Sequence, residues 1–214
     1  MNNLMKCVAL CFALTLSPLA AANNIAPGGN FFGGETTEIL SPQLAGKIVR
    51  DELIPFSFQT WDQRIVSGQL QDRVVHSVDG TYDFYSRVIL DVDSAAFSLY
   101  RVDRIGFAGY ATNVGWRSDG LGNYAPNEFS RDLGGSTIDF NFNMAPLTGG
   151  QSTKFFFIDT NATSYNLSGR FSDYSSLNFM AIAAPVPEPE SYAMLVAGLG
   201  LLGLMARRRR ARQD

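Results

Sequence analysis

Apolar and polar residues alternate along much of the middle of this chain. In residues 137–144 every even position is apolar and every odd position is polar. A period of two predicts a β-strand with one face in a protein core and the other in water. Residues 82–90 show the same period, so the middle of the chain is predicted to consist of strands.

Residues 155–158 read Phe-Phe-Phe-Ile and are apolar on both faces, which predicts a central strand buried between two layers. Many short strands joined by glycine-rich turns predict an all-β, antiparallel β-sandwich or jelly-roll-like domain. The turn signals lie at residues 78–80, 118–120, 134–135 and 149–150. Further strands are expected at residues 54–60, 70–77, 97–107, 112–116 and 177–183.

The β-sandwich domain is expected to span residues 54–184. Residues 23–53 open with paired glycines and few large apolar side chains, which predicts a flexible N-terminal segment. A short helix is expected within it, near residues 42–50.

The first 22 residues have the pattern of a signal peptide. Lys6 precedes the apolar run 7–16, and the small residues Ala20, Ala21 and Ala22 follow. The run is shorter than the roughly 20 residues that a membrane span needs, although a retained N-terminal anchor is the alternative. Both cysteines of the chain, Cys7 and Cys11, lie in this segment. The mature protein is therefore expected to lack disulfides, thiolate metal sites and cysteine nucleophiles.

A second apolar stretch, Ser191–Ala206, lies near the other end and is followed by a run of arginines. Sixteen helical residues rise roughly 24 Å, so we expect a single transmembrane helix that borrows length from its flanks. The arginines favour the cytoplasmic side of the inner membrane, which makes residues 207–214 a basic cytoplasmic tail. This orientation signal consists of Arg207, Arg208, Arg209, Arg210 and Arg212.

The segment before the span carries the sorting motif, Val186, Pro187, Glu188 and Pro189, within a linker at residues 185–190. Its prolines keep the chain extended. The order of this motif, a short span and an arginine run resembles the PEP-CTERM sorting signal of Gram-negative bacteria, over residues 185–212. The resemblance implies an exosortase, a membrane-embedded enzyme resembling cysteine transpeptidases, as processing partner. It also implies removal of the span and release or attachment at the cell surface. A proline-rich stalk before a permanent anchor is the alternative.

Charge and composition exclude several function classes for the middle of the chain. Acidic side chains outnumber basic ones between residues 23 and 186, which disfavours nucleic acid as a partner. His76 is the only histidine, so a histidine zinc site is excluded and any serine triad must use it, without a G-x-S-x-G elbow. Asp91 and Asp93, on one face of an expected strand, are candidates for a glycosidase pair or for calcium ligands, without EF-hand spacing. No catalytic residue, metal or cofactor is assigned.

Carbohydrate contact is the most specific binding that the residues favour. Aromatic faces stack on apolar sugar surfaces, and polar groups at their rim can bond hydroxyls. Trp61 is the other tryptophan, but its apolar neighbours favour a place in the core. The candidate platform comprises Trp116, Tyr110, Tyr124, Arg117 and Asp119.

The sequence thus predicts an exported, non-enzymatic protein of the cell surface or extracellular matrix. The inner membrane is a transient partner, and extracellular polysaccharide is a candidate partner. Two alternatives stay open. One is a carbohydrate-binding or ice-binding module, for which a flat aromatic or threonine-rich face is expected. The other is an extracellular carbohydrate-active hydrolase, for which two carboxylates facing across a cleft are expected.

Overall fold

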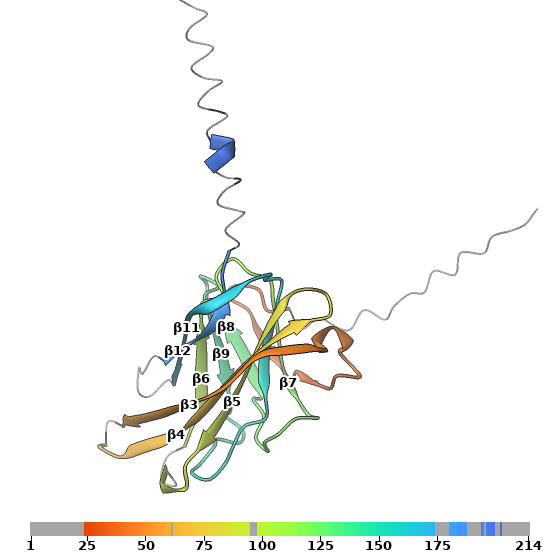
Figure 1. Cartoon of the computed structure of the whole chain (residues 1–214). Helices are drawn as coiled ribbons and strands as arrows, with labels where there is room; N and C mark the ends of the chain where they lie inside the picture. The colour runs from red at the N-terminus through yellow and green to blue at the C-terminus, as the bar shows by residue number, and fades with distance from the viewer. Residues whose placement is uncertain are drawn as a thin grey trace, which may run out of the picture.

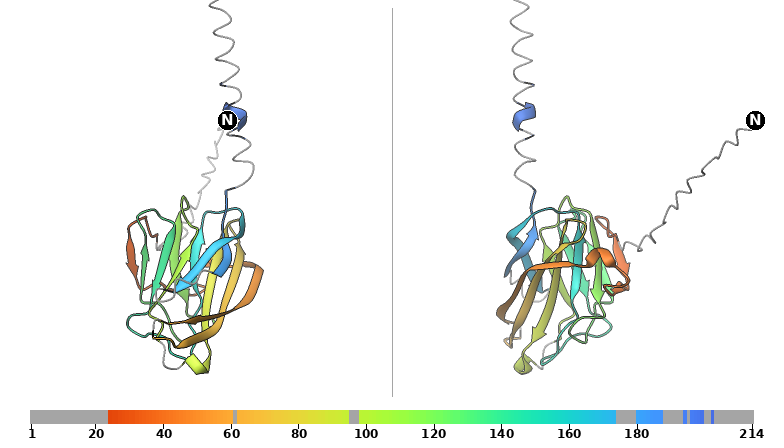
Figure 2. Two further views of the ribbon diagram at one scale, coloured as in Figure 1. Left: turned by 90° about the vertical axis from the view of Figure 1, so that its left-hand side faces the viewer. Right: turned by 45° about the vertical axis from the view of Figure 1, so that its right-hand side comes forward.

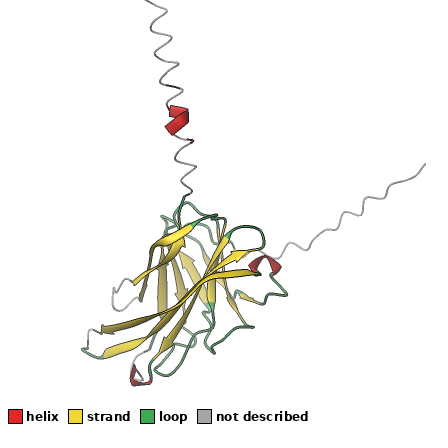
Figure 3. Cartoon of the chain, viewed as in Figure 1, coloured by secondary structure: helices red, strands yellow, loops and turns green. Residues whose placement is uncertain are grey.

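The computed structural model describes residues 24–60, 62–94, 98–173, 180–187, 194, 196–199 and 202. The strands among them, which lie between Asn30 and Pro185, form a sandwich of two six-stranded sheets (Figure 1). The first sheet has the strand order β1-β8-β9-β6-β11-β12 and the second β2-β7-β10-β5-β4-β3. Figure 3 shows that strands dominate the domain and that only short helical turns interrupt them. The all-β sandwich predicted from the alternation is confirmed.

The strands of the first sheet are β1 (Asn30–Phe32), β8 (Glu128–Arg131), β9 (Thr137–Asn141), β6 (Arg101–Ile105), β11 (Tyr165–Asp173) and β12 (Met180–Pro185). Those of the second are β2 (Glu35–Thr36), β7 (Thr112–Arg117), β10 (Phe156–Thr160), β5 (Tyr82–Leu90), β4 (Ile65–Ser77) and β3 (Gly46–Gln59). Two 3₁₀ turns lie between strands. The first, η1 (Pro42–Leu44), lies between β2 and β3, and the second, η2 (Val92–Ser94), lies between β5 and β6. The strand pairs are antiparallel except β2 with β7, which is parallel and departs from the fully antiparallel prediction.

The core lies between the two sheets and is rich in phenylalanine. Phe140 of β9 and Phe156 of β10 face each other with ring centroids 4.4 Å apart. Ile138 and Phe140 of β9 are fully buried, and so is Phe142 just after the strand, whereas Met144, which continues the same alternation, lies in the following turn and is exposed. The alternating pattern therefore identified the inward face of β9 correctly.

The β10 strand is buried on both faces, as its apolar run predicted. Phe156 and Ile158 belong to the core between the sheets, while Phe155 and Phe157 belong to a second cluster on the outer face of the same sheet. Leu44 of η1 covers part of this second cluster. The outer face of this sheet is thus partly covered by the chain that precedes β3.

The N-terminal part of the domain differs from its prediction. Residues 24–53, expected to be flexible, contribute β1, β2 and the first part of β3. The helix expected near residues 42–50 is limited to η1, because the chain from Gly46 onward pairs with β4. The domain boundary expected at residue 54 accordingly falls inside β3.

A buried ion pair joins the sheets next to β12. Arg104 and Asp72 are both fully buried, with Arg104 Nη1 3.4 Å from Asp72 Oδ1. The main chain of Ala183 bonds to both, because its N–H donates to Asp72 Oδ2 at 3.1 Å and its carbonyl accepts from Arg104 Nη2 at 2.6 Å. This pair therefore anchors the last strand to the opposite sheet.

Candidate functional site

The last strand of the sandwich runs directly into the sorting motif. Pro185 pairs with Tyr165 of β11, and the next residue, Val186, is still held by the domain. The Val186 N–H donates to the Ser164 carbonyl at 3.2 Å, and the Ser164 hydroxyl donates to the Val186 carbonyl at 2.7 Å. Val186 and Pro187 are described by the structure, whereas Glu188 and Pro189 lie outside the described residues. The sorting motif thus begins at the surface of the folded domain.

A shallow hollow surrounds the point where the chain leaves the sandwich. It has a volume of about 320 Å³ and is lined by the loops 108–110 and 161–163 together with Val186 and Pro187. Figure 2 shows the chain leaving this end of the sandwich in two further views. Among the described residues that line it, the aromatic one is Tyr110, which comes from the first loop.

Two hydrogen-bonding side chains hold the walls of this hollow. The Asn161 side-chain oxygen accepts from the Ala111 N–H at 3.0 Å and so ties the two loops together. Arg131, almost fully buried, donates to the carbonyls of Phe107 at 2.9 Å and Tyr110 at 3.0 Å. Because a guanidinium has donors in a fixed fork, it fixes several carbonyls at once. The walls of the hollow are therefore preorganised.

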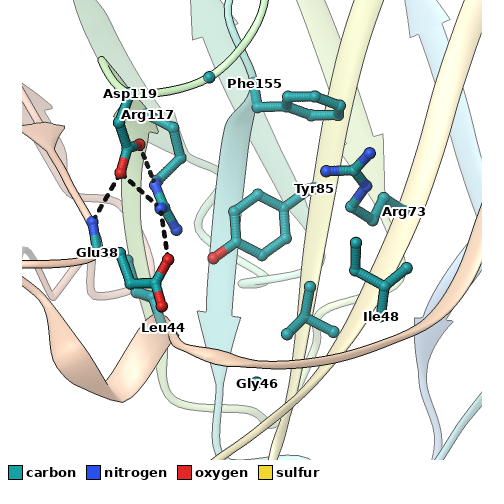
Figure 4. Close-up of a pocket in the computed structure, with 11 residues that line it drawn as sticks. Glu38, Leu44, Gly46, Ile48, Arg73, Tyr85, Arg117, Asp119 and Phe155 are labelled. Atoms are coloured by element: carbon teal, nitrogen blue, oxygen red, sulfur yellow. Dashed lines mark hydrogen bonds and ion pairs between the residues drawn. The ribbon is translucent and has the colours of Figure 1, made fainter.

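A second concave site lies on the outer face of the β2-β7-β10-β5-β4-β3 sheet. Figure 4 shows this groove, which has a volume of about 240 Å³. Its floor is apolar, formed by Leu44, Val75, Tyr85 and Phe155. Arg73 lies at one side, with its guanidinium carbon 4.4 Å from the centre of the Phe155 ring.

The other side of the groove is a charged cluster. Arg117 of β7 makes a two-point contact with Asp119, at 2.7 and 2.8 Å, and lies 3.8 Å from a carboxylate oxygen of Glu38. Hydrogen bonding from Arg117 lowers the pKa of Asp119 to about 2. The same hydrogen bonds raise the pKa of Arg117. The cluster is therefore an arginine between two carboxylates, in which the Arg117–Asp119 pair stays charged over the ordinary pH range.

Tyr85 carries a buried hydroxyl at the centre of this groove. The residue is 4% exposed, and its hydroxyl makes no hydrogen bond of normal geometry with the described residues, although it lies close enough to Arg117 to interact with that guanidinium. Figure 4 shows this hydroxyl pointing across the groove toward the side of Arg117. Burial raises the pKa of Tyr85, so the hydroxyl keeps its proton and can both donate and accept a hydrogen bond.

The structure brings only part of the predicted aromatic platform together. Arg117 and Asp119 line the groove, but Trp116 packs against the core between the sheets and donates from Nε1 to the Gly33 carbonyl at 3.2 Å. Tyr124 also packs against that core, and its hydroxyl accepts from the Gln151 amide at 2.5 Å. Tyr110 lies in the hollow, beyond the other end of β7. Trp61 lies outside the described residues.

The acidic residues form two close cross-strand pairs that the sequence did not single out. Asp103 and Asp139 are directly opposite on β6 and β9, and Arg101 bonds both, at 2.6 and 2.9 Å. Burial raises the pKa of Asp139 to about 6. Asp83 and Asp159 form the second pair, on β5 and β10, and share a hydrogen bond. The carboxyl groups of each pair are in contact with one another and not separated by a cleft.

The structure also locates the other residues that the sequence offered for catalysis or metal binding. His76 is exposed near the end of β4, with its ring centroid 4.9 Å from that of Tyr82. Asp91 and Asp93 do not share a strand face as expected, because β5 ends at Leu90 and Asp93 belongs to η2. Within the described part of the chain, no group of three or more His, Cys, Asp or Glu residues could hold a metal ion.

A sandwich whose last strand continues into a terminal processing segment defines a class of protein, a folded domain delivered by a C-terminal sorting signal. Residues 185–210 match the family model described as the PEP-CTERM protein-sorting motif. The chain therefore carries this motif, as its sequence predicted, and is an exported protein of the kind that an exosortase processes. No curated protein and no solved structure matches the chain.

The signal peptide predicted at residues 1–22 lies outside the described residues. Of the predicted span, Met194, residues 196–199 and Leu202 are described as helical. Among the residues that the structure describes, no helix is long and apolar enough to cross a membrane. The arginine run at residues 207–212 lies outside the described residues.

Proposed function

We propose that this chain is a non-enzymatic protein of the cell surface or extracellular matrix, delivered as a folded β-sandwich and processed at its Pro-Glu-Pro segment. The observation that carries the proposal is the direct passage from β12 into the sorting motif through the Val186–Ser164 contacts. The whole described sandwich lies on the N-terminal side of the motif, so processing there leaves the domain intact.

The arrangement of the ionisable groups supports a non-enzymatic role. A glycosidase needs two carboxyl groups roughly 5–10 Å apart across a sugar-binding cleft. The carboxyl groups of the two cross-strand pairs are in hydrogen-bond contact, and Arg101 bonds both members of one pair. The two carboxylates beside the outer groove, Glu38 and Asp119, both form ion pairs with the arginine between them, Arg117. Arrangements of this kind hold strands together and leave no room between the carboxyl groups for a glycosidic bond.

Replacement of the motif tests the delivery half of the proposal. In a Glu188→Gln chain that also carries Pro187→Ala and Pro189→Ala, we expect at least a tenfold loss of processed surface protein and accumulation of the precursor in the inner membrane. The physical reason is that both the carboxylate and the extended proline geometry are removed. Fractionation followed by immunoblotting measures both species. Normal surface delivery of the variant would rule out recognition at this motif.

Carbohydrate binding in the outer groove is a second candidate function, favoured by the Tyr85 hydroxyl. Buried polar groups in proteins nearly always have a hydrogen-bond partner, so a buried hydroxyl that faces a groove is suited to a ligand hydroxyl. The apolar floor and the charged groups at both sides supply the remaining contacts of a sugar site. The extracellular polysaccharide predicted as a partner would be the ligand.

A glycan array probed with the exported protein tests this second candidate. We expect binding to at least one class of glycan and about a tenfold loss of affinity on Tyr85→Phe, which removes one hydrogen bond worth about 1.4 kcal/mol. Tyr100→Phe is the matched control, because Tyr100 is exposed and outside the groove. Absence of glycan binding, or an equal affinity of both variants, would contradict the assignment.

A further inference from the structure

The distance between the domain and the membrane segment is short. Val186 is hydrogen-bonded to the domain, and the apolar stretch begins at Ser191, so only residues 187–190 lie between them. A fully extended chain of this length covers roughly 14 Å. The motif itself occupies most of that distance. Any enzyme that binds Pro187–Pro189 must therefore approach to within a few ångströms of the end of the sandwich.

The surface that such an enzyme would meet carries small side chains and is open to solvent. We define the junction surface as the loops 108–110 and 161–163 together with Val186 and Pro187, the residues that line the hollow. Ala108, Gly109 and Thr163 are exposed there. Gly109 has a φ of +84°, and a Cβ at this position would meet nothing within 4 Å. The junction surface can therefore receive a protruding side chain or loop without rearrangement.

The junction surface is also fixed before any partner arrives. Asn161 ties its two loops together, and Arg131 holds the carbonyls of Phe107 and Tyr110. Ser164 fixes both main-chain polar groups of Val186, which sets the direction in which the motif leaves the domain. A preorganised surface loses little conformational entropy when it binds, so contact there can add to affinity.

We propose that the junction surface docks onto the outward face of the membrane processing enzyme, which reads it together with the Pro-Glu-Pro segment. This inference rests on the proposed function, because it takes an exosortase-type enzyme as the occupant. The folded domain is then part of the substrate and not a passive cargo. The motif and the junction surface bind as two linked elements, and the short connection between them keeps their effective concentration high.

The test lengthens that connection in the full chain. A flexible Gly-Ser insertion of about ten residues between Val186 and Pro187 leaves both elements intact but separates them. We expect the processing rate in cells to fall about tenfold, measured by pulse-chase labelling and immunoblotting of precursor and product. The matched control is the same insertion after Asn143, in the exposed turn beyond β9. This turn lies at the opposite end of the β6–β9 pair from the loop 108–110, because Arg101 pairs with Asn141 and Ile105 with Thr137.

A point substitution provides an independent measurement. Thr163→Arg places a long charged side chain on the junction surface, and Ala145→Arg places one on an exposed position at the opposite end. We expect Thr163→Arg alone to slow processing, with equal resistance of both variants to limited proteolysis as evidence of folding.

Each outcome of these experiments decides between the two proposals. Processing of the Val186 insertion at the wild-type rate, or faster, would overturn the docking proposal while leaving the sorting function in place. A wild-type chain that is never processed would overturn the sorting function and the docking proposal with it. Slower processing of both the insertion and Thr163→Arg, with normal processing of both controls, is the result that supports docking.

Discussion

Replacing Arg104 with methionine is expected to lower the free energy of unfolding by about 3–5 kcal/mol. Methionine keeps most of the packing of the arginine stem but removes one of the two charges that pair with the buried Asp72, the other being Arg50, whose Nε lies 3.1 Å from Asp72 Oδ2. It also removes the donors to the Ser86 hydroxyl at 2.5 Å and to the Ala183 carbonyl at 2.6 Å. Since folded domains are stable by only about 5–15 kcal/mol, this change brings the domain close to unfolding.

Urea unfolding measures this loss. At a slope of about 2 kcal/mol per molar urea, the midpoint should fall by roughly 2 M. The control is Arg64→Met, since Arg64 is exposed and its ion pair with Asp62 is solvated, so the loss should stay below about 1 kcal/mol. An Arg104→Met chain within about 1 kcal/mol of the wild type would show that the buried pair does not anchor β12.

Stability should fall as the pH rises from about 5 to about 8. Burial, the charge of Asp159 and a hydrogen bond with it together raise the pKa of Asp83 to about 8. An aspartate in an unfolded chain titrates near 3.9. Between these values the folded state keeps a proton that the unfolded state has released, so its stabilising effect is complete below about pH 4 and is lost as the pH rises through about 8.

The measurement is the urea midpoint across this range for three proteins. Asp83→Asn keeps a hydrogen-bonding amide beside Asp159 but carries no titrating proton, so its midpoint should change much less with pH. Asp93→Asn, at an exposed position in η2, should behave as the wild type does. A wild-type midpoint that rises between pH 5 and pH 8 would contradict the shared proton.

The inward faces of the central strands could be predicted from the sequence because burial there is periodic. In β9 and β5 every second side chain enters the core, and in β10 both faces are covered, so the apolar pattern directly reports the environment. The glycine-containing turns could also be predicted from the sequence. Gly80, Gly135 and Gly150 all adopt a positive φ, at +89°, +70° and +80°.

The strands that sequence reasoning missed lack that periodicity for physical reasons. The second half of β3 was predicted, as the strand at residues 54–60, but its first half was missed. The β3 strand lies at the edge of its sheet and is mostly exposed along residues 46–53, so the side chains there have no dry face. In β11 the register shifts between Asn166 and Gly169, which breaks the period of two and leaves Leu167 exposed. The β8 strand has only four residues. Alternation cannot identify such strands.

Only part of the candidate site could be predicted from the sequence, for a related reason. Arg117 and Asp119 are close in sequence, so their pairing beside a turn could be anticipated. Tyr85, Arg73 and Glu38 come from other segments and meet these two residues only through the order of strands in the sheet. The sorting motif, by contrast, is a continuous segment, and it was identified in full from its residues.

The chain is expected to be processed at the Pro-Glu-Pro segment, directly behind the last strand of the sandwich. Intact-mass spectrometry of the protein recovered from the cell surface tests it most directly. The expected species begins at Asn23 and has lost the arginine run at residues 207–212. Surface protein that still contains Arg212 would contradict the account.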